Sequence, residues 1–203
     1  METLDSFLKI SQREVEIVIE TLDVQSLKQA TNLILNCERQ GGRVHVTGIG
    51  KPGHVAGYIA SLLSSTGTSA YELHGTEAVH GSCGQVKKGD VVIAISNSGE
   101  TAELKATVEA LKSNEAHVIS CTRSKSSWLA QHTEVCLVAG VSQEGGPLNK
   151  APRASILAEI LVLQALSVLL QDAKQLTVED YVKWHPGGSL GEGILQEKKG
   201  ERK

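Results

Sequence analysis

The sequence lacks the cysteine patterns that mark disulfide frameworks and zinc motifs. Its 203 residues include four cysteines, and none forms a CxxC pair or stands at a zinc-motif spacing from histidine. Cys121 and Cys136 lie in apolar, strand-like runs, where cysteine behaves as a small hydrophobe. The N-terminus carries Glu2 and Asp5 in place of an apolar leader. Together these features predict a cytoplasmic protein with reduced thiols.

Basic stripes and long apolar runs are also missing. The formal net charge is −3, so nucleic-acid binding has no electrostatic support. No uninterrupted apolar run approaches the roughly 18 residues that span a bilayer, so neither nucleic acid nor membrane is expected as a partner. The length suits one domain, which we place at 1–192, and residues 193–203 are typical of a solvated, charged tail.

Short apolar runs alternate with helical patterns from residue 44 onward, after two helices expected within 3–38. Strands separated by helices predict an α/β fold, a three-layer sandwich with a mostly parallel five-stranded sheet. A long helix is expected over 152–171, followed by a short one that Thr177 caps. The expected strands are 44–47, 70–73, 90–95, 117–122 and 135–138.

The most informative segment is 91–101, VVIAISNSGET, in which a buried strand runs directly into a polar turn and a helix. A helix N-terminus offers unpaired N–H groups and a positive dipole end. Ser96, Ser98 and Thr101 add hydroxyl donors there, and Gly99 permits a close backbone approach. Such a turn alone is more often a helix cap. The strand before it and the three hydroxyls favour a phosphate site, with Asn97 beside them.

A second glycine turn, Gly48-Ile49-Gly50-Lys51, also follows a strand. It is too short for a dinucleotide fingerprint and lacks the Walker A spacing. Lys51 is either a surface cation or a group that neutralises a phosphate or an oxyanion. Ligands of parallel sheets bind at the carboxyl ends of the strands, so both turns are expected to converge on one ligand.

Acidic and histidine side chains in other loops offer proton-transfer chemistry. Glu144 lies in a glycine-rich loop, and His185 precedes Pro186 and two glycines. A lone Glu or His in a loop is usually solvated. His74, Glu77 and His80 have the character of metal ligands, but without further support a polar loop is the better explanation, and no metal is assigned.

The helix expected over 152–171 is apolar nearly all round. Such a helix must be covered on every side. A small domain has little material for that, so we expect contact with another subunit, the alternative being a central core helix.

Five ordered motifs resemble the SIS (sugar isomerase) domain family, and within it the arabinose-5-phosphate isomerases. The resemblance spans about residues 4–192. The motifs are Gly48-Ile49-Gly50-Lys51-Pro52-Gly53-His54, His74-Gly75-Thr76-Glu77-Ala78-Val79-His80-Gly81, Ile95-Ser96-Asn97-Ser98-Gly99-Glu100-Thr101, Glu144 with Pro147-Leu148 and Ala151-Pro152, and His185-Pro186-Gly187-Gly188-Ser189-Leu190-Gly191.

This resemblance implies a flavodoxin-like SIS fold and interconversion of D-arabinose 5-phosphate and D-ribulose 5-phosphate, which supplies 3-deoxy-D-manno-octulosonate (Kdo) for lipopolysaccharide or capsule. It implies no cofactor and a homotetramer whose active sites are shared between subunits. The implied catalytic residues are Lys51, Glu100, Glu144 and His185. The implied substrate-binding residues are Gly50, His80, Ser96, Asn97, Ser98 and Thr101.

Two features depart from the family pattern. Members commonly carry two CBS domains after the isomerase domain, whereas this sequence ends soon after Gly191, so a single-domain form without CBS regulation is expected. The long helix begins Arg153-Ala154-Ser155-Ile156 in place of a Thr/Ser-rich start. A non-catalytic phosphosugar sensor and an isomerase of another sugar phosphate remain as alternatives.

Overall fold

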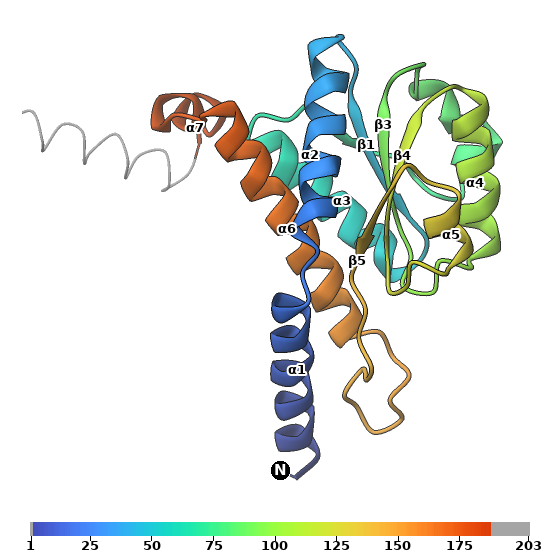
Figure 1. Cartoon of the computed structure of the whole chain (residues 1–203), viewed down its shortest axis with the longest axis vertical. Coiled ribbons are helices and arrows are strands. Elements are labelled where there is room, and N and C mark those ends of the chain that lie inside the picture. The colour runs from blue at the N-terminus through green and yellow to red at the C-terminus, as the bar shows by residue number, and fades with distance from the viewer. Residues whose placement is uncertain (1, 188–203) are drawn as a thin grey trace, which may run out of the picture.

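The computed structural model describes residues 2–187, so the predicted end of the domain at 192 and the tail at 193–203 lie outside the described residues. Helices and strands alternate after two N-terminal helices (Figure 1). The helices are α1 (Glu2–Glu20), α2 (Val24–Arg39), α3 (Lys51–Ser65), η1 (Ala78–His80), η2 (Ser82–Gln85), α4 (Ala102–Ser113), α5 (Trp128–Gln131), α6 (Ala154–Lys174) and α7 (Val178–Trp184). The strands are β1 (Val44–Gly48), β2 (Ala70–Glu72), β3 (Val91–Ile95), β4 (His117–Thr122) and β5 (Val135–Val138).

The five strands form one sheet in the order β2-β1-β3-β4-β5, and every neighbouring pair is parallel. This confirms the predicted sheet. Every residue of β1 and β3 is buried. The continuous apolar run of β3 is typical of a strand that is covered on both faces, whereas β1 alternates and buries the polar side chains of His45 and Thr47. Register pairs Gly48 with Ile95 and Ile95 with Cys121, so β1, β3 and β4 end side by side.

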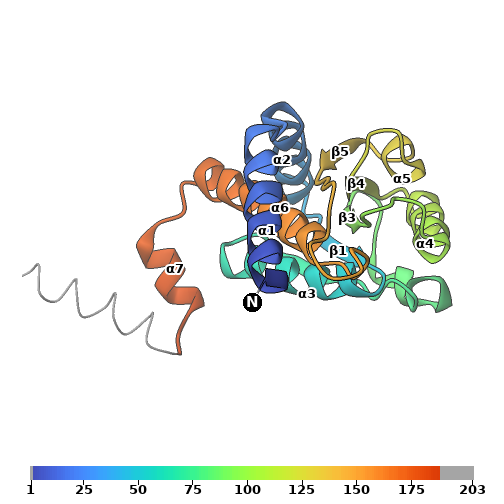
Figure 2. The ribbon, with the colours of Figure 1, turned by 90° about the horizontal axis from the view of Figure 1, so that it is seen from below.

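Helices cover both faces of the sheet, as expected for a three-layer sandwich. Val46, Ile93 and Ile119 face the core formed with α2, α3 and α6. Val92, Ala94 and Val118 face the smaller core formed with α4 and α5. Figure 2 shows the sheet edge-on between these two groups of helices. Alternate residues of each strand therefore serve opposite layers.

Helix α6 packs against α1, α2 and α3 in a single chain. Its sheet-facing side is closed, and Leu163 and Leu166 have no exposed surface. Leu157 and Val168 remain 43% and 62% exposed on the other side. The helix is thus a core helix with an apolar outer face. The expected contact of that face with another subunit stays a prediction.

By length and composition α6 is long and apolar enough to cross a membrane, and half of that window is buried inside the protein. The sequence-based expectation that no segment reaches this length was wrong, because it considered only uninterrupted runs. The apolar sequence of α6 is interrupted by Glu159, Gln164 and Gln171. These polar residues do not lower the mean hydropathy of the helix below that of a membrane-spanning segment. A buried core helix passes the same test, since covering it on several sides demands the same apolar surface.

Asp90, immediately before β3, joins the amino ends of the central strands. Its carboxylate is buried and accepts hydrogen bonds from the backbone N–H groups of Arg43 and Lys87, both at 2.9 Å. It also lies 3.2 Å from Nε2 of the buried His45. Burial lowers the pKa of His45, and the hydrogen bond to Asp90 opposes this effect. Asp90 therefore binds groups from the start of β1 and from the turn that precedes β3.

Replacing this carboxylate should cost substantial stability. In Asp90→Ala the two N–H groups and His45 lose their shared acceptor, and we expect the free energy of unfolding to fall by about 3 kcal/mol. Urea denaturation would measure the change, with Glu109→Ala on the exposed side of α4 as the control. A loss no larger than that of the control would show that Asp90 does not anchor the sheet.

Candidate active site

The predicted functional turns lie at one edge of the sheet because all strands are parallel. Gly48–Lys51 follows β1, residues 96–101 follow β3, and residues 139–153 follow β5. We call 96–101 the phosphate turn and 139–153 the Glu144 loop. The latter is the long orange loop below the sheet in Figure 1. Neighbouring strands are about 5 Å apart, so the turns after β1 and β3 are adjacent, and the Glu144 loop leaves the same edge two strands beyond β3.

The hydroxyl groups of the phosphate turn make hydrogen bonds within the turn. Oγ of Ser96 accepts from the backbone N–H of Gly99 at 3.1 Å and lies 3.2 Å from Oγ1 of Thr101. Thr101 is the N-cap residue of α4, yet its side chain makes no capping hydrogen bond. The N–H groups at the start of α4 are therefore left for an anion, which argues against the simple helix-cap interpretation.

Gly99 is required at its position in the phosphate turn. Its φ is +67°, a conformation that favours glycine, and a Cβ there would lie 2.6 Å from Cβ of Ser127. Ser98 is exposed, whereas the amide oxygen of Asn97 is buried without a hydrogen-bond partner among the described residues. Ser98 is thus open to solvent, with its hydroxyl oxygen accepting from the backbone N–H of Glu100 at 3.2 Å, whereas the amide oxygen of Asn97 is enclosed by the protein.

The turn after β1 presents Lys51 at the first position of α3. Gly50 has a φ of +67° and Pro52 occupies the first turn, so the chain is set to start a helix there. Lys51 is exposed. A cavity of about 180 Å³ lies beside it, lined by the segments around Gly50 and Gly75. The loops after β1 and β2 therefore meet. The expected convergence of the 48–51 and 96–101 turns on one ligand stays a prediction.

The histidine segment forms part of this neighbourhood. Nδ1 of His74 lies 3.0 Å from Oγ1 of Thr76, within the wall of the cavity. His80 is exposed in η1. Within residues 2–187 no three His, Cys, Asp or Glu side chains are grouped closely enough to hold a metal ion.

Glu144 occupies the N-terminus of α6. Its Oε2 accepts from the backbone N–H groups of Arg153 at 2.6 Å and Ser155 at 3.1 Å. The positive end of the α6 dipole therefore stabilises its charge. Oε1 of Glu144 makes no hydrogen bond within residues 2–187, which leaves one carboxylate oxygen available for a substrate proton.

Glu100 is engaged differently. Its carboxylate accepts from the backbone N–H of Trp128 at 2.7 Å and pairs with Lys105 at 2.6 Å. The hydrogen bond from Lys105, followed by that from Trp128, lowers the pKa of Glu100. These contacts tie the phosphate turn to α4 and α5, so Glu100 has a structural task on this side of the sheet.

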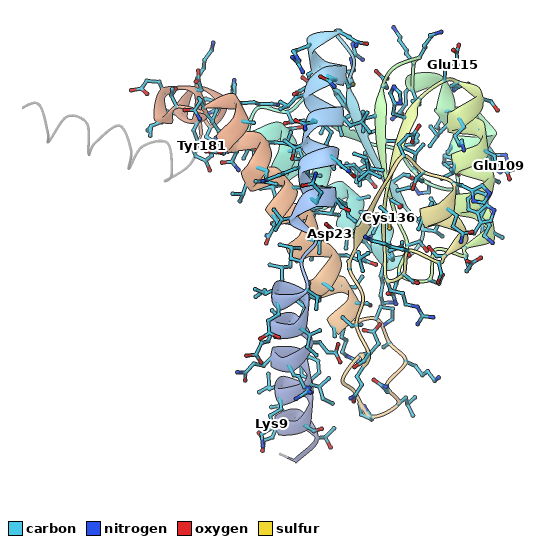
Figure 3. All side chains as sticks on the ribbon, viewed as in Figure 1. Lys9, Asp23, Glu109, Glu115, Cys136 and Tyr181 are labelled. Carbon is cyan, nitrogen blue, oxygen red and sulfur yellow. The ribbon has the colours of Figure 1, made fainter. Side chains whose placement is uncertain are left out.

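His185 does not join the other predicted catalytic residues within one chain. It follows α7, where its ring stacks on Tyr181 with centroids 4.0 Å apart. Trp184 contacts Gly67, near the amino end of β2. Figure 3 labels Tyr181 at the end of α6 that is remote from the Glu144 loop. The catalytic role of His185 stays a prediction that a single chain does not complete.

Glu14 of α1 is a site residue that the sequence analysis did not identify. Its buried carboxylate accepts from the backbone N–H groups of Ser142 at 2.8 Å and Gln143 at 3.1 Å, and from the Ser142 hydroxyl. Helix α1 thereby holds the Glu144 loop. The available signal was spacing: Glu14 lies between Ile10 and Val18 at intervals of four, on the buried face of the helix.

Comparison with known proteins identifies the family of this chain. The family model described as SIS domain matches residues 38–169, well over half of the chain. The chain belongs to the SIS domain family. The matched segment of this SIS domain includes Lys51, the phosphate turn and the Glu144 loop, and it ends before His185.

Curated relatives of this SIS domain are longer proteins. Arabinose 5-phosphate isomerase KdsD of Pseudomonas aeruginosa is 39% identical over 192 residues, covering 93% of this chain and 59% of the relative. KdsD of Escherichia coli K12 is 41% identical over 167 residues, covering 81% and 51%. The chain therefore spans between half and three-fifths of the length of these relatives.

A solved structure shares the fold of this SIS domain. A protein of Escherichia coli CFT073 in complex with arabinose 5-phosphate superposes with a TM-score of 0.84 at 37% sequence identity, covering 90% of this chain and 95% of that one. The architecture that positions the three loops is thus common to both proteins.

The contact between Glu14 and the Glu144 loop leads to a measurable expectation. Glu14→Gln replaces an acceptor with an amide that cannot accept all three hydrogen bonds, so we expect a loss of about 1–3 kcal/mol in stability. Amide hydrogen exchange should accelerate at Ser142 and Gln143 more than in β3. The control is Glu16→Gln, an exposed position on the same helix. Unchanged exchange in the loop would contradict the holding role.

Proposed function

We propose that this chain is an aldose–ketose isomerase that interconverts D-arabinose 5-phosphate and D-ribulose 5-phosphate. The observation that carries the proposal is the uncapped N-terminus of α4 in the phosphate turn, at the same sheet edge as Lys51 and Glu144. The names of the KdsD relatives and the arabinose 5-phosphate complex of the structural neighbour support this substrate. The product would supply Kdo synthesis for lipopolysaccharide or capsule.

The phosphate group is the handle by which the substrate is held. Ser98, Ser96 and Thr101 donate hydroxyl hydrogen bonds, and the first N–H groups of α4 face the same anion. Gly50 and His80 border the sugar from the neighbouring loops. The phosphate does not react, but its contacts with the protein hold C1 and C2 of the sugar near the catalytic groups.

Glu144 is the proton shuttle in this proposal. Its free oxygen removes the proton from C2 of the open-chain aldose and returns it to C1, while the hydroxyl proton on O2 passes to O1. Lys51 stabilises the negative charge of the enediolate, and His185 assists ring opening. The reaction transfers no net electrons, so it requires no redox cofactor. Glu100, whose pKa is lowered by hydrogen bonds from Lys105 and Trp128, orients the turn.

The proposed assembly is a cytoplasmic homotetramer with shared sites. Support comes from the exposed apolar residues Leu157 and Val168 on α6 and Leu4 and Leu8 on α1. Helix α1 projects beyond the sheet in Figure 1, where a second copy could cover it. In this assembly His185 of a neighbouring copy reaches the Glu144 loop. All four cysteines are free, which agrees with a reducing compartment.

Turnover of arabinose 5-phosphate to ribulose 5-phosphate by the purified full chain tests the activity. Glu144→Gln keeps an acceptor for the α6 N–H groups and removes the base, so we expect kcat to fall by about 10²–10⁴-fold. Glu16→Gln, exposed on α1, is the control.

Near-normal turnover by folded Glu144→Gln would overturn the shuttle assignment. Binding of sugar phosphates without any turnover by the wild-type chain would identify a sensor. Turnover of a hexose or heptose phosphate alone would identify an isomerase of another sugar.

Shared sites predict recovery of activity on mixing two inactive variants. Glu144→Gln supplies an intact His185, and His185→Ala supplies an intact Glu144. If each site combines these residues from two copies, random reassembly restores about a quarter of the sites, since a site is intact only when both contributors are correct. Unfolding and refolding the variants together, then assaying isomerase activity, measures this. Absence of recovery in mixed tetramers would place both residues in one chain.

A further inference from the structure

A carboxyl group lies in the middle of the most apolar helix of this protein. Glu159 of α6 has no exposed surface, and neither of its oxygens finds a hydrogen-bond partner among the described residues. An ionised carboxylate without partners is very costly in such a place, and the usual response is to keep the proton. Neither the fold nor the proposed proton shuttle accounts for Glu159.

The position of Glu159 relates it directly to Glu144. Ser155, whose backbone N–H binds Oε2 of Glu144 at 3.1 Å, precedes Glu159 by one helical turn. Residues four apart lie on the same face of a helix. Oγ of Ser155 is also buried without a partner among the described residues. A polar strip therefore runs inward from Glu144 through Ser155 to Glu159.

The surroundings of Glu159 within residues 2–187 contain no cation that would stabilise its charge. Cys121 of β4 is the ionisable group that faces it from the sheet, and Glu144 faces it from the loop. Glu14 of α1 is occupied by the loop backbone. The core faces of α2 and α3 are apolar except for Thr31 and Cys37. Burial first, and then the charge of Glu144, raises the pKa of Glu159 to about 8.

We propose that Glu159 is a positioning residue for the proton shuttle: a buried carboxylic acid that stays protonated at neutral pH, so that the single negative charge of the pair resides on Glu144. The role in turnover rests on the proposed isomerase function, while the paired protonation is a property of the protein itself. When Glu159 ionises, a second negative charge enters beside Glu144 and beside the developing enediolate, and turnover falls.

Infrared spectroscopy of the full chain reads the protonation state without any substrate. The absorption of a protonated, buried carboxyl group should be present at pH 6, disappear around pH 8, and be missing from Glu159→Gln. In Glu144→Gln the same band should disappear at lower pH, because the neighbouring charge has gone. Glu109→Gln on α4, whose exposed position Figure 3 labels, is the control. Ionisation of Glu159 in the ordinary range of glutamate, or insensitivity to Glu144→Gln, would overturn the pairing.

The pH dependence of the free energy of unfolding provides a second test, which can be used even where a substitution changes the stability of the protein. The folded pKa of Glu159 is raised above its unfolded value of 4.5, so the native state holds one more proton than the unfolded state between about pH 4.5 and 8. The unfolding equilibrium constant should therefore rise about tenfold per pH unit in that window through this group. Glu159→Gln and Glu159→Met should both remove this contribution. A pH dependence equal to that of the wild type would contradict the buried proton.

The pH profile tests the role in turnover. In the wild type, kcat should fall about tenfold between pH 7 and pH 9 as Glu159 loses its proton, and Glu159→Gln should lose this decline. An identical decline in both proteins would overturn the positioning role. Absence of sugar-phosphate turnover in the wild type would instead refute the proposed function, and the infrared and stability titrations would still decide the protonation of the pair.

Discussion

Parallel pairing of β1, β3, β4 and β5 is the constraint on which the rest of this structure depends. Because every strand points the same way, every strand ends at the same edge, and the loops that follow must gather there. Lys51, the phosphate turn and the Glu144 loop are separated by about 45 residues each in the sequence and share that edge. The buried bonds of Asp90 hold the opposite edge, where β1 and β3 begin.

Three glutamates have different roles because their surroundings differ. Glu14 is a buried acceptor for backbone N–H groups and holds a loop. Glu144 uses one oxygen to cap α6 and keeps the other free. Glu159, without a donor or cation near it among the described residues, holds its proton. The chemistry we propose depends on these differences, since a shuttle needs one charged carboxylate in a fixed place and no second charge beside it.

Much of the fold could be predicted from short-range pattern. The strand bounds at 117–122 and 135–138 match the structure because apolar runs between turn residues admit little else. Thr177 forms the expected cap of α7, with a full capping box, since that geometry involves only neighbouring residues. The strand, turn and helix over 91–113 could be predicted for the same reason, while phosphate binding by that turn stays a prediction. The expectation that no segment is long and apolar enough to cross a membrane was wrong for α6. The mean hydropathy over the whole helix decides this, and the length of an uninterrupted apolar run does not.

The sequence by itself determined the layers, the order of strands and helices, and which turns carry donors and bases, because these follow from local periodicity and turn chemistry. Only the tertiary structure decided which of these groups are free to act. Glu100 is tied to Lys105 and Trp128, and Glu14 reaches a loop 128 residues away. Glu144 binds the amino end of α6, whereas His185 follows α7, which comes after the carboxyl end of α6. The protonation state of a side chain and its hydrogen-bond partners depend on burial and on residues that are distant in the sequence. A local sequence pattern therefore determines neither of them.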